Sequence, residues 1–197
     1  MHFEFCILNF IVLYPVFLKL RGRRVLLVGG GAVAASKLEG LLAAGALVTV
    51  VAPEMSPALE RRDVTLHRRA FVPGDLDGTW WVVAAASPEV NRQVQAAAES
   101  RQLFVNAVDD PVHATAYLGS VVRRDDVTVA ISTAGRAPAL AALLREALDA
   151  WLPQDLDRWI LAADDARRQW KESGVPMERR RPLLLETLNR LYESKKP

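Results

Sequence analysis

The 197-residue sequence predicts an α/β fold: a parallel sheet wound on both faces by helices, then a β-hairpin, then a helical carboxyl-terminal part. Three observations predict it. Residues 24–44 combine a buried-strand pattern, a glycine cluster and a helical pattern. Strand and helix patterns then alternate as far as residue 108. Beyond residue 116, two neighbouring strand-like runs give way to helices.

The first strand and its glycine turn carry the strongest signal. Residues 25–28 are a short apolar run, typical of a strand buried on both faces. Gly29, Gly31 and Ala34 then fit the pattern G-x-G-x-x-[GA]. In that pattern the first glycine permits a tight turn, the second lets the backbone approach a pyrophosphate, and the small third residue lets helix pack on strand. Because the helix amides and dipole face the phosphates, we expect a dinucleotide site in a Rossmann-type domain; a tight turn without ligand is the alternative.

The second strand, expected at residues 47–51, ends at Ala52-Pro53-Glu54. In such sites an acidic residue about 20 positions beyond the glycines holds the adenosine ribose hydroxyls. Glu54 lies near that point but follows a proline, so it is a weak candidate that otherwise opens a short helix at residues 56–62. No arginine stands at the strand end to bind a 2′-phosphate, which favours NAD over NADP. Arg61 and Arg62 are close enough to make that preference slight.

The rest of the expected sheet follows in order. Further strands are expected at residues 64–67, 80–85 and 104–108, with a helix at 88–100 capped by Ser87. In open parallel sheets ligands bind beyond the carboxyl ends of the strands. The loops after Gly29, Val51, Ala85 and Val108 should therefore meet at one edge of the sheet.

The pattern changes in the second half. Strand-like runs at 116–122 and 127–132, joined by four polar residues, suggest a hairpin whose exposed edge suits dimerisation. Helices are expected at residues 139–151, 155–172 and 178–193. The chain should thus divide into a nucleotide-binding domain (1–112), a dimerisation region (113–152) and a helical domain (153–197).

The amino-terminal residues are apolar but fit no targeting segment. The apolar run at 5–18 is shorter than the roughly 20 residues of a membrane span, and it lacks a basic leader and a cleavage site. Residues 14–20 are expected to form a strand that pairs with or covers the sheet, and residues 1–13 to be an extension.

Composition limits the remaining classes of function. The net charge of +2 favours neither a nucleic-acid nor a membrane partner. The single cysteine, Cys6, cannot form an internal disulfide, which favours the cytoplasm and a buried, inert thiol. Without a cysteine cluster, an iron–sulfur or structural zinc centre is not expected.

One candidate base follows the last sheet strand. A carboxylate of the adjacent pair Asp109 and Asp110 would lie at the ligand edge, where it can remove a proton while a nicotinamide takes a hydride from the same substrate. A plain Asp-Pro turn is the alternative, favoured by Asp110 before Pro111. His113 could assist proton transfer or bind metal, although a single loop histidine usually does neither.

A candidate anion receptor precedes the long helix at residue 139. It combines two hydroxyls, a glycine and a guanidinium: Ser132, Thr133, Gly135 and Arg136. Together with a helix N-terminus these groups can bind a substrate carboxylate. The alternative is a helix cap with an exposed arginine.

Three motifs in order resemble one family. The run at 14–31, the segment Asn-Ala-Val-Asp-Asp-Pro at 106–111, and 129–146 with Ser-Thr-Ala-Gly-Arg-Ala-Pro resemble the precorrin-2 dehydrogenase and sirohydrochlorin ferrochelatase family, the amino-terminal module of siroheme synthase. The resemblance implies a homodimer that oxidises the tetrapyrrole precorrin-2 to sirohydrochlorin with NAD. Some members also insert ferrous iron as a second substrate. A non-catalytic NAD-sensing module is the alternative reading.

The resemblance also carries residue roles. Asp109 matches the family's essential aspartate, thought to be the general base and a candidate metal ligand. The residues that contact NAD in the family match Ala32, Val33, Pro53 and Glu54 of this chain. A serine near the family's active site matches Ser132. Many relatives carry an acidic residue where this chain has Ala32, so that position cannot act through charge here.

Overall fold

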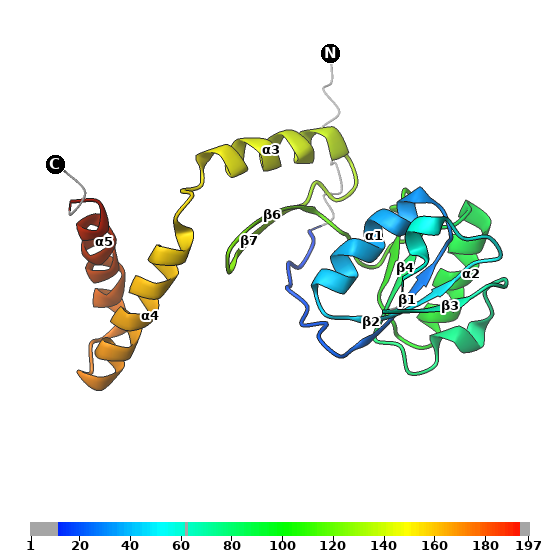
Figure 1. Ribbon diagram of the computed structural model, residues 1–197, viewed down its shortest axis with the longest axis horizontal. Helices are drawn as coiled ribbons and strands as arrows, with labels where there is room; N and C mark the ends of the chain where they lie inside the picture. Colours follow the sequence, from blue (N-terminus) through cyan, green and yellow to red (C-terminus); the bar gives the residue numbers. More distant parts are fainter. Residues whose placement is uncertain (1–11, 62, 194–197) are drawn as a thin grey trace, which may run out of the picture. The chain divides into compact units, whose positions relative to one another are not determined.

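The computed structural model describes residues 12–61 and 63–193 (Figure 1). The described residues form two compact units. The first contains the chain up to Leu118 together with Ala134–Ala137; the second contains Gly119–Thr133 and the chain from Pro138 onward. The three-part division expected from the sequence remains a prediction.

The first unit is built on a five-stranded parallel sheet with the order β3-β2-β1-β4-β5, the Rossmann arrangement that the sequence predicts. Its strands are β1 (Arg24–Val28), β2 (Leu47–Val51), β3 (Val64–His67), β4 (Trp81–Ala84) and β5 (Val105–Ala107). Its helices are α1 (Ala32–Ala43) and α2 (Pro88–Glu99), with 3₁₀ turns η1 (Pro57–Leu59) and η2 (Pro73–Leu76).

The core lies on both faces of β1 because successive side chains of a strand point to opposite faces. Leu27 belongs to a cluster with Leu38 of α1, whereas Leu26 belongs to a second cluster with Val94 of α2. All four side chains are at most 1% exposed. Two helices therefore cover opposite faces of the sheet, and β1 is held centrally with its carboxyl end fixed.

The strand expected at residues 14–20 is absent from the described structure, and that prediction was wrong. Tyr14 and Phe17 are 89% and 71% exposed, and of this segment only Leu20 enters the core. A strand requires a neighbour with unpaired N–H and C=O groups, and an apolar composition does not supply one. The helix expected at 56–62 is only the short turn η1. Cys6, Arg62 and the expected extension, as far as residue 11, lie outside the described residues.

The second unit begins with an antiparallel hairpin formed by β6 (Ser120–Arg124) and β7 (Val127–Ile131). Arg124 pairs with Val127, so the turn contains only Asp125 and Asp126, with Asp125 at φ +50°. The connection is therefore shorter than the four residues expected. The strand also starts later than residue 116, because the Thr115 and Ala116 amides bind the Val105 carbonyl at the edge of β5.

Three helices complete the second unit, as predicted: α3 (Pro138–Trp151), α4 (Leu156–Glu172) and α5 (Met177–Glu193). Helices α4 and α5 lie side by side as a hairpin (Figure 1), where Trp159 Nε1 donates to Tyr192 Oη at 2.6 Å. In the part of the chain described, no helix is both long and apolar enough to cross a membrane.

Candidate functional site

The three glycines after β1 have different surroundings. Gly29 has φ +132°, and a Cβ there would lie 2.2 Å from the Ala85 carbonyl oxygen. A Cβ at Gly30 would lie 1.7 Å from the Glu54 carbonyl oxygen. At Gly31 an added Cβ would meet nothing within 4 Å. The protein's own packing therefore requires the first two glycines, whereas Gly31 borders open space where a ligand can approach.

Helix α1 begins at this open position. Its N-cap is Gly31, which offers no side-chain acceptor to the first-turn amides, and the first turn contains no acidic residue. Ala32 and Val33 are exposed, while Ala34 is fully buried against the sheet. Neither the N-cap nor the first turn therefore compensates the positive end of the helix dipole with a side chain, which fits a pyrophosphate.

The neighbouring loops pack on the glycine turn. The Ser56 amide donates to the Gly30 carbonyl at 2.7 Å, so the loop containing Pro53 and Glu54 lies beside the turn with both residues exposed. The Ala85 amide donates to the Val28 carbonyl at 2.7 Å. The loops after β1, β2 and β4 therefore meet at the carboxyl end of the sheet, as expected.

Two residues that organise this edge were not singled out from the sequence. Gly30 stands at the x between the two glycines of the pattern G-x-G-x-x-[GA], where any residue is allowed. The run of three glycines could have indicated that this position also needs glycine. Asn91 is 2% exposed, and its side-chain oxygen accepts from the Ala86 amide at 3.1 Å, which fixes the loop after β4. A polar residue within an otherwise amphipathic helix gave no such signal.

Arg61 lies between two carboxylates. Its Nη1 is 2.7 Å from Glu39 Oε1 and its Nε is 3.1 Å from Asp63 Oδ1. The hydrogen bond that Arg61 donates to Asp63 raises the pKa of Arg61 above its ordinary value, and the same bond lowers the pKa of Asp63. The guanidinium is therefore already paired within the chain.

The two adjacent aspartates in the loop after β5 have different contacts. The Asp110 carboxylate is 2.7 Å from His113 Nδ1, so these two side chains pair with each other. Asp109 is exposed, has φ +58°, and has no hydrogen-bond partner among the described residues. The Val108 amide donates to the Ala84 carbonyl at 2.9 Å, which ties this loop to the end of β4.

The expected anion receptor is divided between the units. Gly135 and Arg136 belong to the first unit, where a Cβ on Gly135 would lie 3.2 Å from Pro111 Cβ. Ser132 and Thr133 belong to the second unit. The structure therefore brings Gly135 against the loop that carries Asp109.

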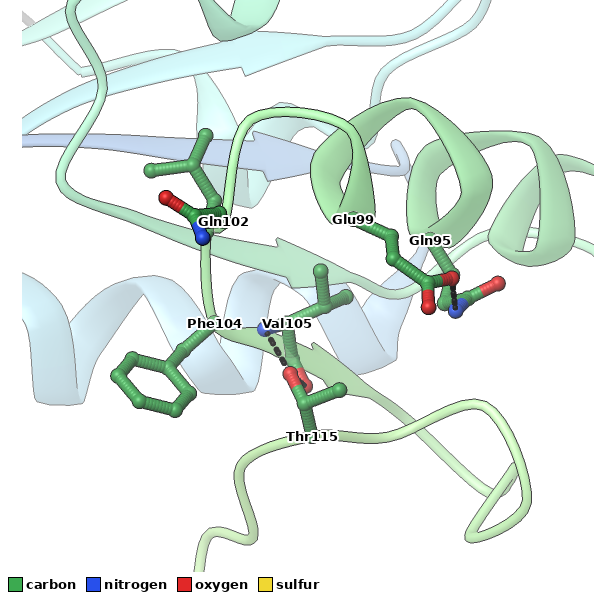
Figure 2. Close-up of a pocket in the computed structure, with 7 residues that line it drawn as sticks. Gln95, Glu99, Gln102, Phe104, Val105 and Thr115 are labelled. Carbon is green, nitrogen blue, oxygen red and sulfur yellow. Dashed lines mark hydrogen bonds between the residues drawn. The ribbon is translucent and has the colours of Figure 1, made fainter.

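No metal-ligand cluster marks this edge in the described residues. No three His, Cys, Asp or Glu side chains there are grouped as metal ligands. A pocket of about 210 Å³ instead lies between the end of α2 and the start of β5, lined by Glu99, Phe104 and Thr115 among others (Figure 2). Because it borders the amino end of β5, it is not the predicted site.

Comparisons with known proteins agree with this geometry. A family model described as "Putative NAD(P)-binding" matches residues 16–120, over half of the chain, and one described as "Sirohaem biosynthesis protein central" matches residues 124–150. Siroheme synthase of Photorhabdus laumondii is 43% identical over 180 residues, covering 89% of this chain and 38% of that protein. Siroheme synthase 1 of Aeromonas hydrophila is 42% identical, and the match covers 85% of this chain and 37% of that protein. The chain belongs to the siroheme synthase and precorrin-2 dehydrogenase family.

A solved structure extends the family match over both units. SirC, a precorrin-2 dehydrogenase, superposes with a TM-score of 0.71 at 28% identity, covering 88% of each chain. The chain spans less than two fifths of the siroheme synthases that it matches. What this family module shares with them is the NAD(P)-binding domain and the central segment.

Proposed function

We propose that this chain catalyses the NAD-dependent dehydrogenation of precorrin-2 to sirohydrochlorin. One observation carries the proposal: the glycine turn and the Asp109 loop leave the carboxyl ends of strands in one sheet and are tied together through β4. The Ala85 amide binds the carbonyl of Val28, and the Val108 amide binds the carbonyl of Ala84. The family match supports the same reaction, because SirC, which the chain resembles in structure, is a precorrin-2 dehydrogenase.

In this proposal Gly31 and the amides of Ala32 and Val33 hold the pyrophosphate, with Pro53 and Glu54 beside the adenosine ribose. Bound NAD supplies the hydride acceptor. Asp109, exposed and without an internal partner, takes the substrate proton. Arg136 and the Gly135 backbone attract substrate carboxylates, with Ser132 and Thr133 contributing hydroxyls and His113 polar contacts.

The pairing of Arg61 supports NAD as the cofactor rather than NADP. A 2′-phosphate needs a cation that is not already neutralised, and Arg61 binds Glu39 and Asp63. We expect the dissociation constant for NADP to exceed that for NAD, as measured by fluorescence titration of the two reduced cofactors.

The decisive assay mixes the purified chain with precorrin-2 and NAD without oxygen and follows NADH absorbance. Turnover above a protein-free control supports the dehydrogenase. NAD binding without turnover would favour the alternative, a non-catalytic NAD-sensing module.

Ferrous iron insertion remains a separate prediction, with Asp109 and His113 as its candidate ligands. It is tested by incubating the chain with sirohydrochlorin and Fe²⁺ without oxygen and following the absorption spectrum. A rate equal to the protein-free rate would exclude it.

We further propose that the chain acts as a homodimer in the cytoplasm. Helix α3 carries Leu140, Leu143, Leu144 and Trp151 on one face, between 43% and 77% exposed. The neighbouring Ala141 is buried, and α3 packs against β6. An apolar stripe of this kind, with no partner among the described residues, suits a second copy of the chain.

A further inference from the structure

The backbone at Asp109 is strained. Its φ of +58° lies in the left-handed region, which side chains other than glycine rarely adopt, although aspartate tolerates it better than most. Such a conformation is unfavourable for a residue with a side chain and persists only where the surrounding structure holds it. Contacts of the neighbouring residues must therefore hold the Asp109 backbone in this conformation.

Hydrogen bonds between β5 and residues 115–116 close the base of the loop. The Val105 amide donates to Thr115 Oγ1 at 2.8 Å, the contact drawn in Figure 2. The Val105 carbonyl accepts from the Thr115 and Ala116 amides, both at 2.9 Å. Asn106 Nδ2 donates to the Ala116 carbonyl at 3.0 Å. Residues 107–114 thus form a closed loop with Asp109 in its first half.

Inside the loop, Pro111 is held from two sides. Tyr117 Oη donates to the Pro111 carbonyl at 2.8 Å. On the other side, the Gly135 backbone packs against the Pro111 ring, and a Cβ on Gly135 would also lie 3.6 Å from Tyr117 Cε1. The Asp110–His113 pair braces the residues between these contacts.

We propose that Tyr117 is a positioning residue for Asp109. Its hydroxyl fixes the Pro111 peptide, two residues beyond the base, and so limits the rotation that would relax the left-handed backbone. The inference rests on the proposed dehydrogenase function, because it assigns Tyr117 to the group that takes the proton. A misplacement of about 1 Å at a reacting group can lower a rate by orders of magnitude.

The test is Tyr117→Phe, which removes one hydroxyl and keeps the ring beside Gly135. We expect kcat for precorrin-2 oxidation to fall about tenfold, with KM for NAD, NAD affinity and melting temperature unchanged. Tyr14→Phe is the matched control, because Tyr14 is 89% exposed, and it should behave as wild type.

A double-mutant cycle separates positioning from general stability. In an Asp109→Ala background, Tyr117→Phe should have no further effect on the residual single-turnover rate. Unchanged kcat in the single variant, or the same fold loss with and without Asp109, would overturn the proposal. If wild type shows no turnover, NAD reduction is missing in every variant, and the proposed function fails together with this inference.

Discussion

At the residue scale, the glycine turn separates two glycines that the packing requires from one that borders open space. Gly29 and Gly30 are packed against backbone carbonyls, so any side chain there disturbs the fold itself. Gly31 has φ −88° and open space around it, so a side chain there is compatible with the folded chain. This difference makes Gly31 the position at which cofactor binding can be tested without unfolding.

We expect Gly31→Asp to abolish NAD binding while the melting temperature stays near that of wild type, because the new carboxylate would lie against the pyrophosphate. Titration calorimetry with NAD checks it. Gly40→Asp is the matched control: Gly40 lies in the same helix, also in open space, and its variant should bind NAD normally. Unchanged affinity in Gly31→Asp would place the cofactor elsewhere.

Asp109→Ala should leave NAD affinity intact and lower precorrin-2 oxidation by at least about a hundredfold, the usual loss for a proton-transfer group. Asp110→Ala serves for comparison, because its carboxylate is occupied by His113. That variant should lose less activity than Asp109→Ala. The reverse order would assign the base to Asp110.

At the element scale, η2 depends on one carboxylate. Asp75 accepts from both terminal nitrogens of Arg69 and from the Val72 amide, and its side chain is 7% exposed. The hydrogen bond from Arg69 lowers the pKa of Asp75 below its ordinary value of 3.8. The ionised form therefore stabilises the fold above that value, and the contribution is lost as pH falls through the lower folded-state pKa.

Asp75→Asn should lower the free energy of unfolding by about 1.5–3 kcal/mol near neutral pH, the range for a hydrogen bond to a charged group. The difference from wild type should shrink in acid, below about pH 4. Urea denaturation across this pH range measures it. Asp77→Asn is the control, because the Asp77 side chain is 73% exposed, and it should change stability little. A pH-independent difference would contradict the role of the Asp75 charge.

At the scale of the whole molecule, the apolar face of α3 is left uncovered by the other described residues. Leu143 is 63% exposed at its centre. We expect Leu143→Glu to shift the chain from dimer to monomer in sedimentation velocity, because the charge would have to be desolvated in the interface. Glu146→Lys, on the same helix beside this face, should remain dimeric. A wild-type monomer at all concentrations would refute the dimer.

Local patterns determined much of this protein. The five parallel strands and five α-helices of the described residues could be predicted because their signals are local. A glycine turn, a run of apolar strand residues and helical spacing can each be recognised within a short stretch of sequence. The edge at which the loops after β1, β2 and β4 meet followed from the parallel order alone. The family membership followed from three motifs in sequence order.

Only the tertiary structure decided which contacts each of several similar residues makes. It distinguished Gly31 from Gly30, and Asp109 from Asp110, by the atoms that surround each one. It also showed that residues 14–20 form no strand and that Tyr117 braces the Asp109 loop. These outcomes depend on contacts between segments that are far apart in the chain. A local sequence pattern does not show which distant segment will pack against a given residue.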